Sequence, residues 1–100
     1  MAPVPPVVDV SCSGTVVVVA LEGHLDRDAG TTLVEVAQAA AVGDVTRLDV
    51  DLRAVTSFDE AGANSLVACR AVGAALAEGL HYRTGQGAGR QALLAAYAAT

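Results

Sequence analysis

Apolar and polar residues recur along this chain with two different periods. Thr15 to Glu22 is a β-branched run, and residues 48–52 alternate apolar and acidic side chains, as strands with one buried face do. From Ala61 onward the large apolar side chains recur at steps of three and four, which predicts a long helix to about Glu78: Leu66, Cys69, Val72 and Leu76. The change of period places the boundary between strand and helix near Phe58 and Asp59.

The remaining segments complete a pattern of strands and helices. Val7 to Cys12 alternates weakly before the turn signal Ser13-Gly14, so it forms an opening hairpin with the next strand. A helix is expected after Asp28, its N-cap, and ends at Gly43. Leu80 to Thr84 is a short candidate strand, and a last short helix follows Arg90.

The predicted order is therefore β-β-α-β-α-β-α over a single domain, residues 1–100, with residues 1–6 as a flexible Pro-rich lead-in. Strands separated by helices imply parallel neighbours, whereas the first hairpin is antiparallel. We expect an α/β fold in which helices pack on a mixed sheet of about four strands.

Composition and charge narrow the classes of partner. The chain is 53% hydrophobic, all six of its cations are Arg, and its formal net charge is -5. The chain has no basic cluster, so it is not expected to bind nucleic acid or an anionic membrane surface. Its longest apolar run, Val16 to Leu21, is too short to cross a membrane, so no membrane insertion is expected. No signal peptide is recognisable, so a cytoplasmic location is expected. Cys12 and Cys69 are interpreted as reduced small hydrophobes.

The stretch Thr56 to Asn64 lies where strand gives way to helix, and we interpret it as the working loop of the protein. Asp59 and Glu60 fall in the first turn of the helix, where unpaired amides and the positive end of the dipole favour carboxylates. Ordinary helix capping explains two acids at this position equally well. The residues alone leave both interpretations open.

Two short motifs follow the two long strands. The first is Gly23-His24-Leu25-Asp26, and the second runs from Asp51-Leu52 through Val55 to Phe58-Asp59-Glu60-Ala61-Gly62. Together they resemble a STAS domain, the fold of bacterial anti-sigma factor antagonists and of a wider set of regulatory modules. The second motif is similar to that family's strand, loop and Asp-Ser-Ser-Gly helix start, and the order of elements matches over nearly the whole chain.

The resemblance implies a non-enzymatic module that regulates transcription by partner switching. In the antagonists the first Ser after the Asp is phosphorylated by the kinase fold of the anti-sigma factor, and this releases the complex. Glu60 occupies that position here and Ala61 replaces the second Ser, whereas Asp59 and Gly62 are kept. The chain therefore lacks the hydroxyl of the switch, and Glu60 partly imitates the phosphorylated state.

The resemblance places a partner-binding face at the start of the second long helix. An anti-sigma factor of the kinase fold is the expected partner. An alternative is an accessory subunit of an ABC-type lipid transport ATPase, which Ala61 favours slightly. Whether the protein forms a weak homodimer stays open. The expected face consists of Asp26, Ser57, Asp59, Glu60, Ala61, Gly62 and Asn64.

Other kinds of site find less support in the sequence. No nucleophile stands beside a base in the second motif, and His24 and His81 are too far apart to form a motif, so we expect no catalytic residues, cofactor or metal. Residues 85–89 with Arg90 could present amides to a phosphate, which leaves a small-ligand or nucleotide sensor as a third hypothesis. Gly62 serves either the approach of a partner or tight packing on the sheet.

Overall fold

The computed structural model describes residues 6–98, in which four strands and three helices follow the expected order. β1 (Val7–Ser13) pairs antiparallel with β2 (Val16–Leu25), which pairs parallel with β3 (Arg47–Phe58). β4 (Leu80–Arg83) is parallel to β3, so the sheet order is β1-β2-β3-β4. The α/β fold with a mixed sheet is confirmed. The lead-in predicted over residues 1–6 lies outside the described residues, apart from Pro6.

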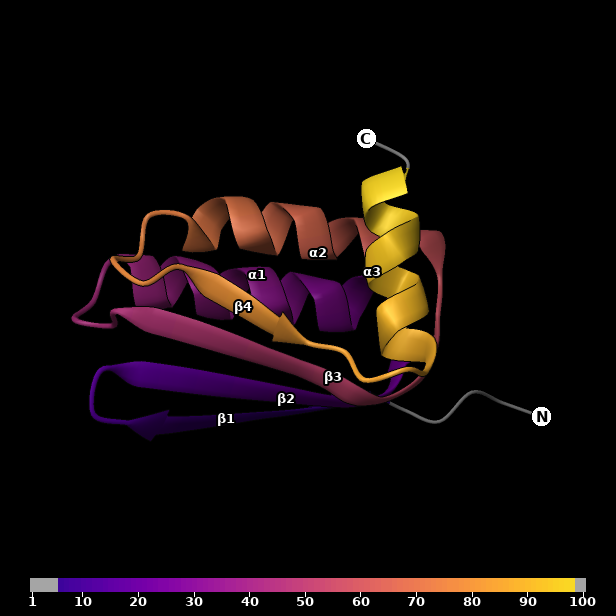
Figure 1. The fold of residues 1–100 in the computed structure, drawn as a ribbon, viewed down its shortest axis with the longest axis horizontal. Coiled ribbons are helices and arrows are strands. Elements are labelled where there is room, and N and C mark those ends of the chain that lie inside the picture. The colour runs from indigo at the N-terminus through magenta and orange to yellow at the C-terminus, as the bar shows by residue number, and fades with distance from the viewer. Residues whose placement is uncertain (1–5, 99–100) are drawn as a thin grey trace.

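The helices cover one face of the sheet. α1 (Arg27–Ala41) and α2 (Glu60–Gly73) lie side by side on it, and α3 (Ala88–Ala98) stands across them against β3 (Figure 1). The core between these layers is almost entirely aliphatic, as the composition predicts, and its largest fully buried side chains are Leu21, Leu25, Leu33, Leu48, Leu52, Leu66, Val19, Val50 and Cys69. None of the helices in residues 6–98 is long and apolar enough to cross a membrane.

β2 extends further than its sequence pattern predicts. It continues past the run Thr15 to Glu22 through His24 and Leu25, whereas β3 ends at Phe58, at the boundary that the change of period predicts. The two ends pair with each other, Leu25 opposite Phe58, after two register shifts in β2. The alternation of buried and accessible residues in β2 continues to Leu25, which is fully buried, so pairing with β3 and burial extend this strand past Glu22.

The predicted working loop over Thr56 to Asn64 does not exist as a loop. Residues up to Phe58 belong to β3, Asp59 is the N-cap, and Glu60 begins α2. At its other end α2 is shorter than predicted, because it finishes at Gly73 instead of near Glu78. Tight turns follow, and Gly79 closes them with a φ of 76° that suits glycine.

Gly62 lies at the closest approach between α2 and the end of β2. A Cβ at this position would stand 2.0 Å from the carbonyl oxygen of Leu25, which is backbone and cannot rotate away. The missing side chain therefore lets the first turn of α2 rest on β2, and Gly62 is buried there. Of the two roles expected for this glycine, the structure supports packing.

We predict that Gly62→Ala destabilises the protein by about 1–3 kcal/mol or more, although Ala is the better helix former by roughly 1 kcal/mol. The added methyl group must push α2 away from β2. Gly87→Ala is the matched control, since no heavy atom lies within 4 Å of a Cβ there. Urea denaturation measures both variants, and equal midpoints would contradict the close approach.

The two cysteines occupy different environments. Cys69 is buried in α2, where its thiol donates to the carbonyl oxygen of Leu33, and burial raises its pKa to about 11. Cys12, in contrast, is exposed on β1, the edge strand. Both thiols are free.

Alkylation with iodoacetamide near pH 8 should therefore modify Cys12 in the native protein and leave Cys69 intact, because only thiolate reacts. In denaturant both should react. Mass spectrometry of the digested protein distinguishes the two sites. Equal labelling under native conditions would show that Cys69 is not shielded.

Candidate functional site

The site that the sequence predicts lies where β2 and β3 end and α1 and α2 begin. Both strands run in the same direction, so their carboxyl ends meet at one edge of the molecule, at the right of Figure 1. The amide of Asp59 donates to the carbonyl oxygen of Leu25 at 3.2 Å, which ties the start of α2 to the end of β2. Two strand ends and two helix starts thus form a continuous surface.

An aspartate caps each helix at this surface. Asp26 Oδ1 accepts a hydrogen bond from the Ala29 amide at 2.8 Å, and Asp59 Oδ1 accepts one from the Gly62 amide at 2.7 Å. Each carboxylate satisfies an amide that the helix itself leaves unpaired. The cap of α1 is Asp26 and not Asp28 as predicted, because β2 continues to Leu25 and the helix starts at Arg27.

Glu60 is the first residue of α2 and is exposed. Its carboxylate stands at the positive end of the helix dipole, which favours a negative charge by about 0.3–1 kcal/mol. Asp59 beside it is also exposed, with 48% of its side-chain surface accessible. The start of α2 therefore presents two neighbouring carboxylates to solvent.

The other expected residues divide between the surface and the interior. Ala61 and Asn64 are exposed on the first turns of α2, and Ser57 is half-buried near the end of β3. Gly62 is buried against Leu25, so its assignment to the partner-binding face is corrected to a packing role. Six of the seven expected residues thus remain available to a surface at this end of the sheet.

The structure adds His24 to the residues expected at this surface. His24 lies opposite Ser57 in the pairing of β2 with β3, and its Nδ1 is 2.7 Å from Ser57 Oγ. Its Nε2 is 3.7 Å from Asp59 Oδ2. The signal in the sequence was its place in Gly23-His24-Leu25-Asp26, but only the strand register shows what it contacts.

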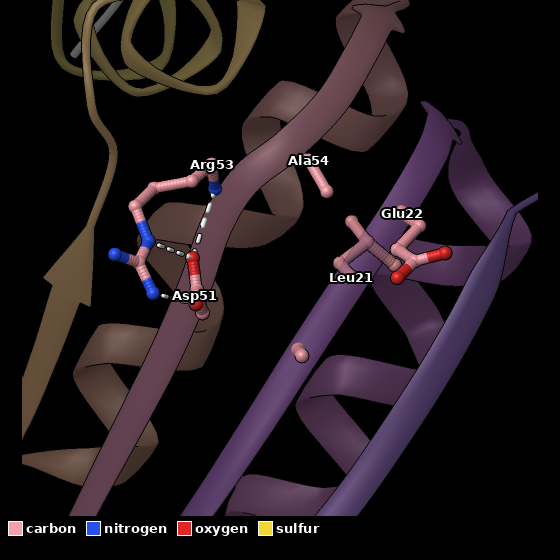
Figure 2. Close-up of a pocket in the computed structure, with 6 residues that line it drawn as sticks. Leu21, Glu22, Asp51, Arg53 and Ala54 are labelled. Atoms are coloured by element: carbon pink, nitrogen blue, oxygen red, sulfur yellow. Dashed lines mark hydrogen bonds and ion pairs between the residues drawn. The ribbon is translucent and has the colours of Figure 1, made fainter.

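An open depression of about 270 Å³ lies on the sheet where β2 shifts register against β3 (Figure 2). The Arg53 guanidinium donates to both carboxylate oxygens of Asp51, at 3.0 and 2.7 Å, and this lowers the pKa of the Asp51 carboxyl. These two charges neutralise each other, which leaves the exposed Glu22 carboxylate as the unpaired charge in the lining. Its lining residues are Ala20, Leu21, Glu22, Asp51, Arg53 and Ala54.

In the described part of the chain, no group of three or more His, Cys, Asp or Glu side chains could hold a metal ion. The segment from Gly85 to Gly89 forms a turn and the first residues of α3. Gly85 has a φ of 61° and lies near the side chain of Arg53. This turn follows the carboxyl end of β4.

Two solved structures with a similar fold are anti-sigma factor antagonists. One from Mycobacterium paratuberculosis superposes with a TM-score of 0.68 at 22% identity, over 87% of this chain and 74% of the other. The antagonist SpoIIAA in its unphosphorylated form gives a TM-score of 0.63 at 18% identity, over 88% and 82% of the two chains. The fold is the STAS fold. A scan of protein-family models and a search of curated proteins both find no match.

The four residues at the start of α2 divide into two pairs. Glu60 and Ala61, which differ from the Asp-Ser-Ser-Gly motif considered in the sequence analysis, are both exposed, whereas Asp59 and Gly62, which match it, both support the first turn of the helix. The retained positions thus serve the local structure, and the altered positions face solvent.

We predict that Asp26→Ala lowers the free energy of unfolding by about 1 kcal/mol, because the Ala29 amide loses its acceptor. Asp28→Ala is the control: Asp28 is exposed in the first turn of the same helix and contributes through the dipole, by roughly 0.5 kcal/mol or less. Chemical denaturation compares the two variants. If Asp28→Ala lowered the free energy of unfolding as much as Asp26→Ala does, the assignment of Asp26 as the N-cap would be contradicted.

Proposed function

We propose that this protein is a non-enzymatic regulatory module that binds another protein through the surface at the start of α2. The observation that carries the proposal is the exposed Glu60 in the first turn of α2, beside the capping residue Asp59, in a STAS fold. The proposed surface, called the α2 surface below, consists of Asp26, Ser57, Asp59, Glu60, Ala61 and Asn64.

The charge of Glu60 distinguishes this surface from one that is switched by phosphorylation. A phosphoserine at a helix start brings about -1.5 to -2 charges and three acceptor oxygens, whereas Glu60 brings a single charge and two oxygens permanently. No kinase can phosphorylate residue 60. The α2 surface therefore resembles one fixed state of a phosphorylation switch.

The chemistry of the partner decides what this charge does. Against a surface shaped for a neutral serine, burying the unpaired carboxylate of Glu60 costs on the order of 2–5 kcal/mol, which weakens binding roughly 30-fold to several thousand-fold. Against a surface with an arginine opposite, the same carboxylate forms a charge-assisted hydrogen bond and strengthens binding. The proposed partner is an anti-sigma factor of the kinase fold.

A second candidate partner is an ABC-type lipid transport ATPase, of which this protein would be an accessory subunit. Ala61 supports it, because a small apolar side chain stands exposed beside Glu60 where the family motif has a second serine. Recovery of a transport ATPase instead of a sigma regulator in a pull-down with the tagged protein would favour this candidate.

We predict that Glu60→Ser and Glu60→Ala each change the affinity for a kinase-fold anti-sigma factor by about tenfold or more, in the direction set by the charge opposite residue 60. Isothermal titration calorimetry measures the change.

Glu35→Gln is the matched control, since Glu35 is exposed in the middle of α1 and outside the α2 surface. It removes the same unit of charge and should leave the affinity unaltered. A change below about threefold in both Glu60 variants would remove Glu60 from the mechanism.

A further inference from the structure

Three polar side chains from two segments of the chain, the end of β2 and the junction of β3 with α2, meet at the α2 surface. The hydroxyl of Ser57 lies 2.7 Å from Nδ1 of His24, and Nε2 of the same imidazole lies 3.7 Å from Oδ2 of Asp59. His24 has 20% of its side-chain surface accessible. The hydroxyl, the imidazole and the carboxylate thus follow one another in a row, with the imidazole in the middle.

One tautomer of the imidazole allows Nδ1 to accept a hydrogen bond from Ser57. Ser57 can donate its proton to Nδ1 only if the ring proton is on Nε2, and Nε2 is the nitrogen that faces the carboxylate of Asp59. A nearby carboxylate stabilises an N–H on that side and the imidazolium that forms when the ring takes a second proton. Asp59 therefore leaves Nδ1 free to accept the Ser57 proton.

The positions of the three groups are fixed by secondary structure. His24 and Ser57 are opposite each other in the β2–β3 ladder, so two paired strands hold the hydroxyl against the imidazole. The other oxygen of Asp59 is engaged with the Gly62 amide at 2.7 Å, which orients Oδ2 toward His24. Groups held on strands and at a helix cap keep the geometry that proton transfer needs.

We propose that Ser57 is an activated nucleophile that accepts an acyl group, with His24 as its base and Asp59 as a positioning residue. Ser57 Oγ attacks the carbonyl carbon of an activated ester, the new Oγ–C bond forms, and the bond from carbon to the leaving group breaks. The Ser57 proton passes to Nδ1 of His24 and then to the departing group, so no oxidant or metal is required.

The charge around the site favours a neutral acyl donor. Asp59 and Glu60 are exposed carboxylates next to Ser57, Asp26 is close by at the start of α1, and the chain as a whole carries a formal net charge of -5. These charges repel anionic phosphoryl donors, whereas an uncharged ester or thioester carbonyl meets no such barrier.

Acylation would alter the α2 surface without any change at Glu60. It would convert the Ser57 hydroxyl, which contacts His24, into an ester and would add an apolar group at the carboxyl end of β3. The inference goes beyond the proposed function and does not depend on a partner, because the modification can be measured on the protein alone.

The full chain is treated with p-nitrophenyl acetate, a neutral activated ester, and two signals are followed: release of p-nitrophenol and the position of the acetyl group by peptide mass spectrometry. The sequence suits this experiment because it contains no Lys, and Cys12→Ser serves as the parent protein since Cys12 is an exposed thiol. We expect the acetyl group on Ser57.

Matched variants separate the proposed site from general surface reactivity. Ser57→Ala and His24→Gln should each lower the rate of p-nitrophenol release by about tenfold or more. Thr56→Val and His81→Gln should retain the parental rate, because Thr56 is an exposed hydroxyl beside Ser57 and His81 is bonded to the carbonyl oxygen of Glu78. Circular dichroism checks folding, and the Ser57→Ala and Thr56→Val pair remains decisive if His24→Gln fails to fold.

Asp59→Asn tests the positioning role, since Asn also caps a helix but carries no charge. It should lower acylation and, in ¹⁵N spectra of the imidazole, increase the share of the tautomer with the proton on Nδ1; a merely structural residue would not shift this ratio. The proposal would be overturned if Ser57→Ala released p-nitrophenol at the parental rate, or if the acetyl groups were spread over other hydroxyls.

Discussion

The contact between the first turn of α2 and the last residues of β2 determines most of this structure. Gly62 allows the helix backbone to rest on the carbonyl group of Leu25, and that carbonyl accepts the amide of Asp59. Any side chain at position 62 would push the helix off the strand. This single contact fixes the direction of α2 and places Asp59 and Glu60 at the edge of the sheet.

The sequence predicts the elements and the junction between β3 and α2, but it misplaces the end of β2, the start of α1 and the end of α2. Alternation of acidic and apolar residues identifies β3, and helical spacing identifies α2, because one buried face imposes a period on each. The ends depend on pairing that is not local. β2 reaches Leu25 and β3 reaches Phe58 because these two residues pair with each other after register shifts between the strands. The N-cap of α1 is therefore Asp26, two residues before the predicted Asp28.

The same distinction applies to the candidate site. The exposure of Glu60 follows from local rules, since carboxylates at a helix start are favoured and tend to face water. The contact between His24 and Ser57 does not follow from local rules. These residues are 33 positions apart, and only the register of two strands brings them together. The role of Gly62 was open in the sequence for a similar reason: the atom it must avoid belongs to a distant strand.

The direct passage from β3 through a single cap residue into α2 has a consequence for recognition. A flexible segment must lose conformational entropy when a partner immobilises it, at roughly 1–2 kcal/mol for each backbone residue. Here the backbone of Ser57, Asp59 and Glu60 is already ordered by the strand ladder and the helix. A partner that docks at this edge meets a rigid template, so discrimination between partners falls to the shape and charge of a few side chains.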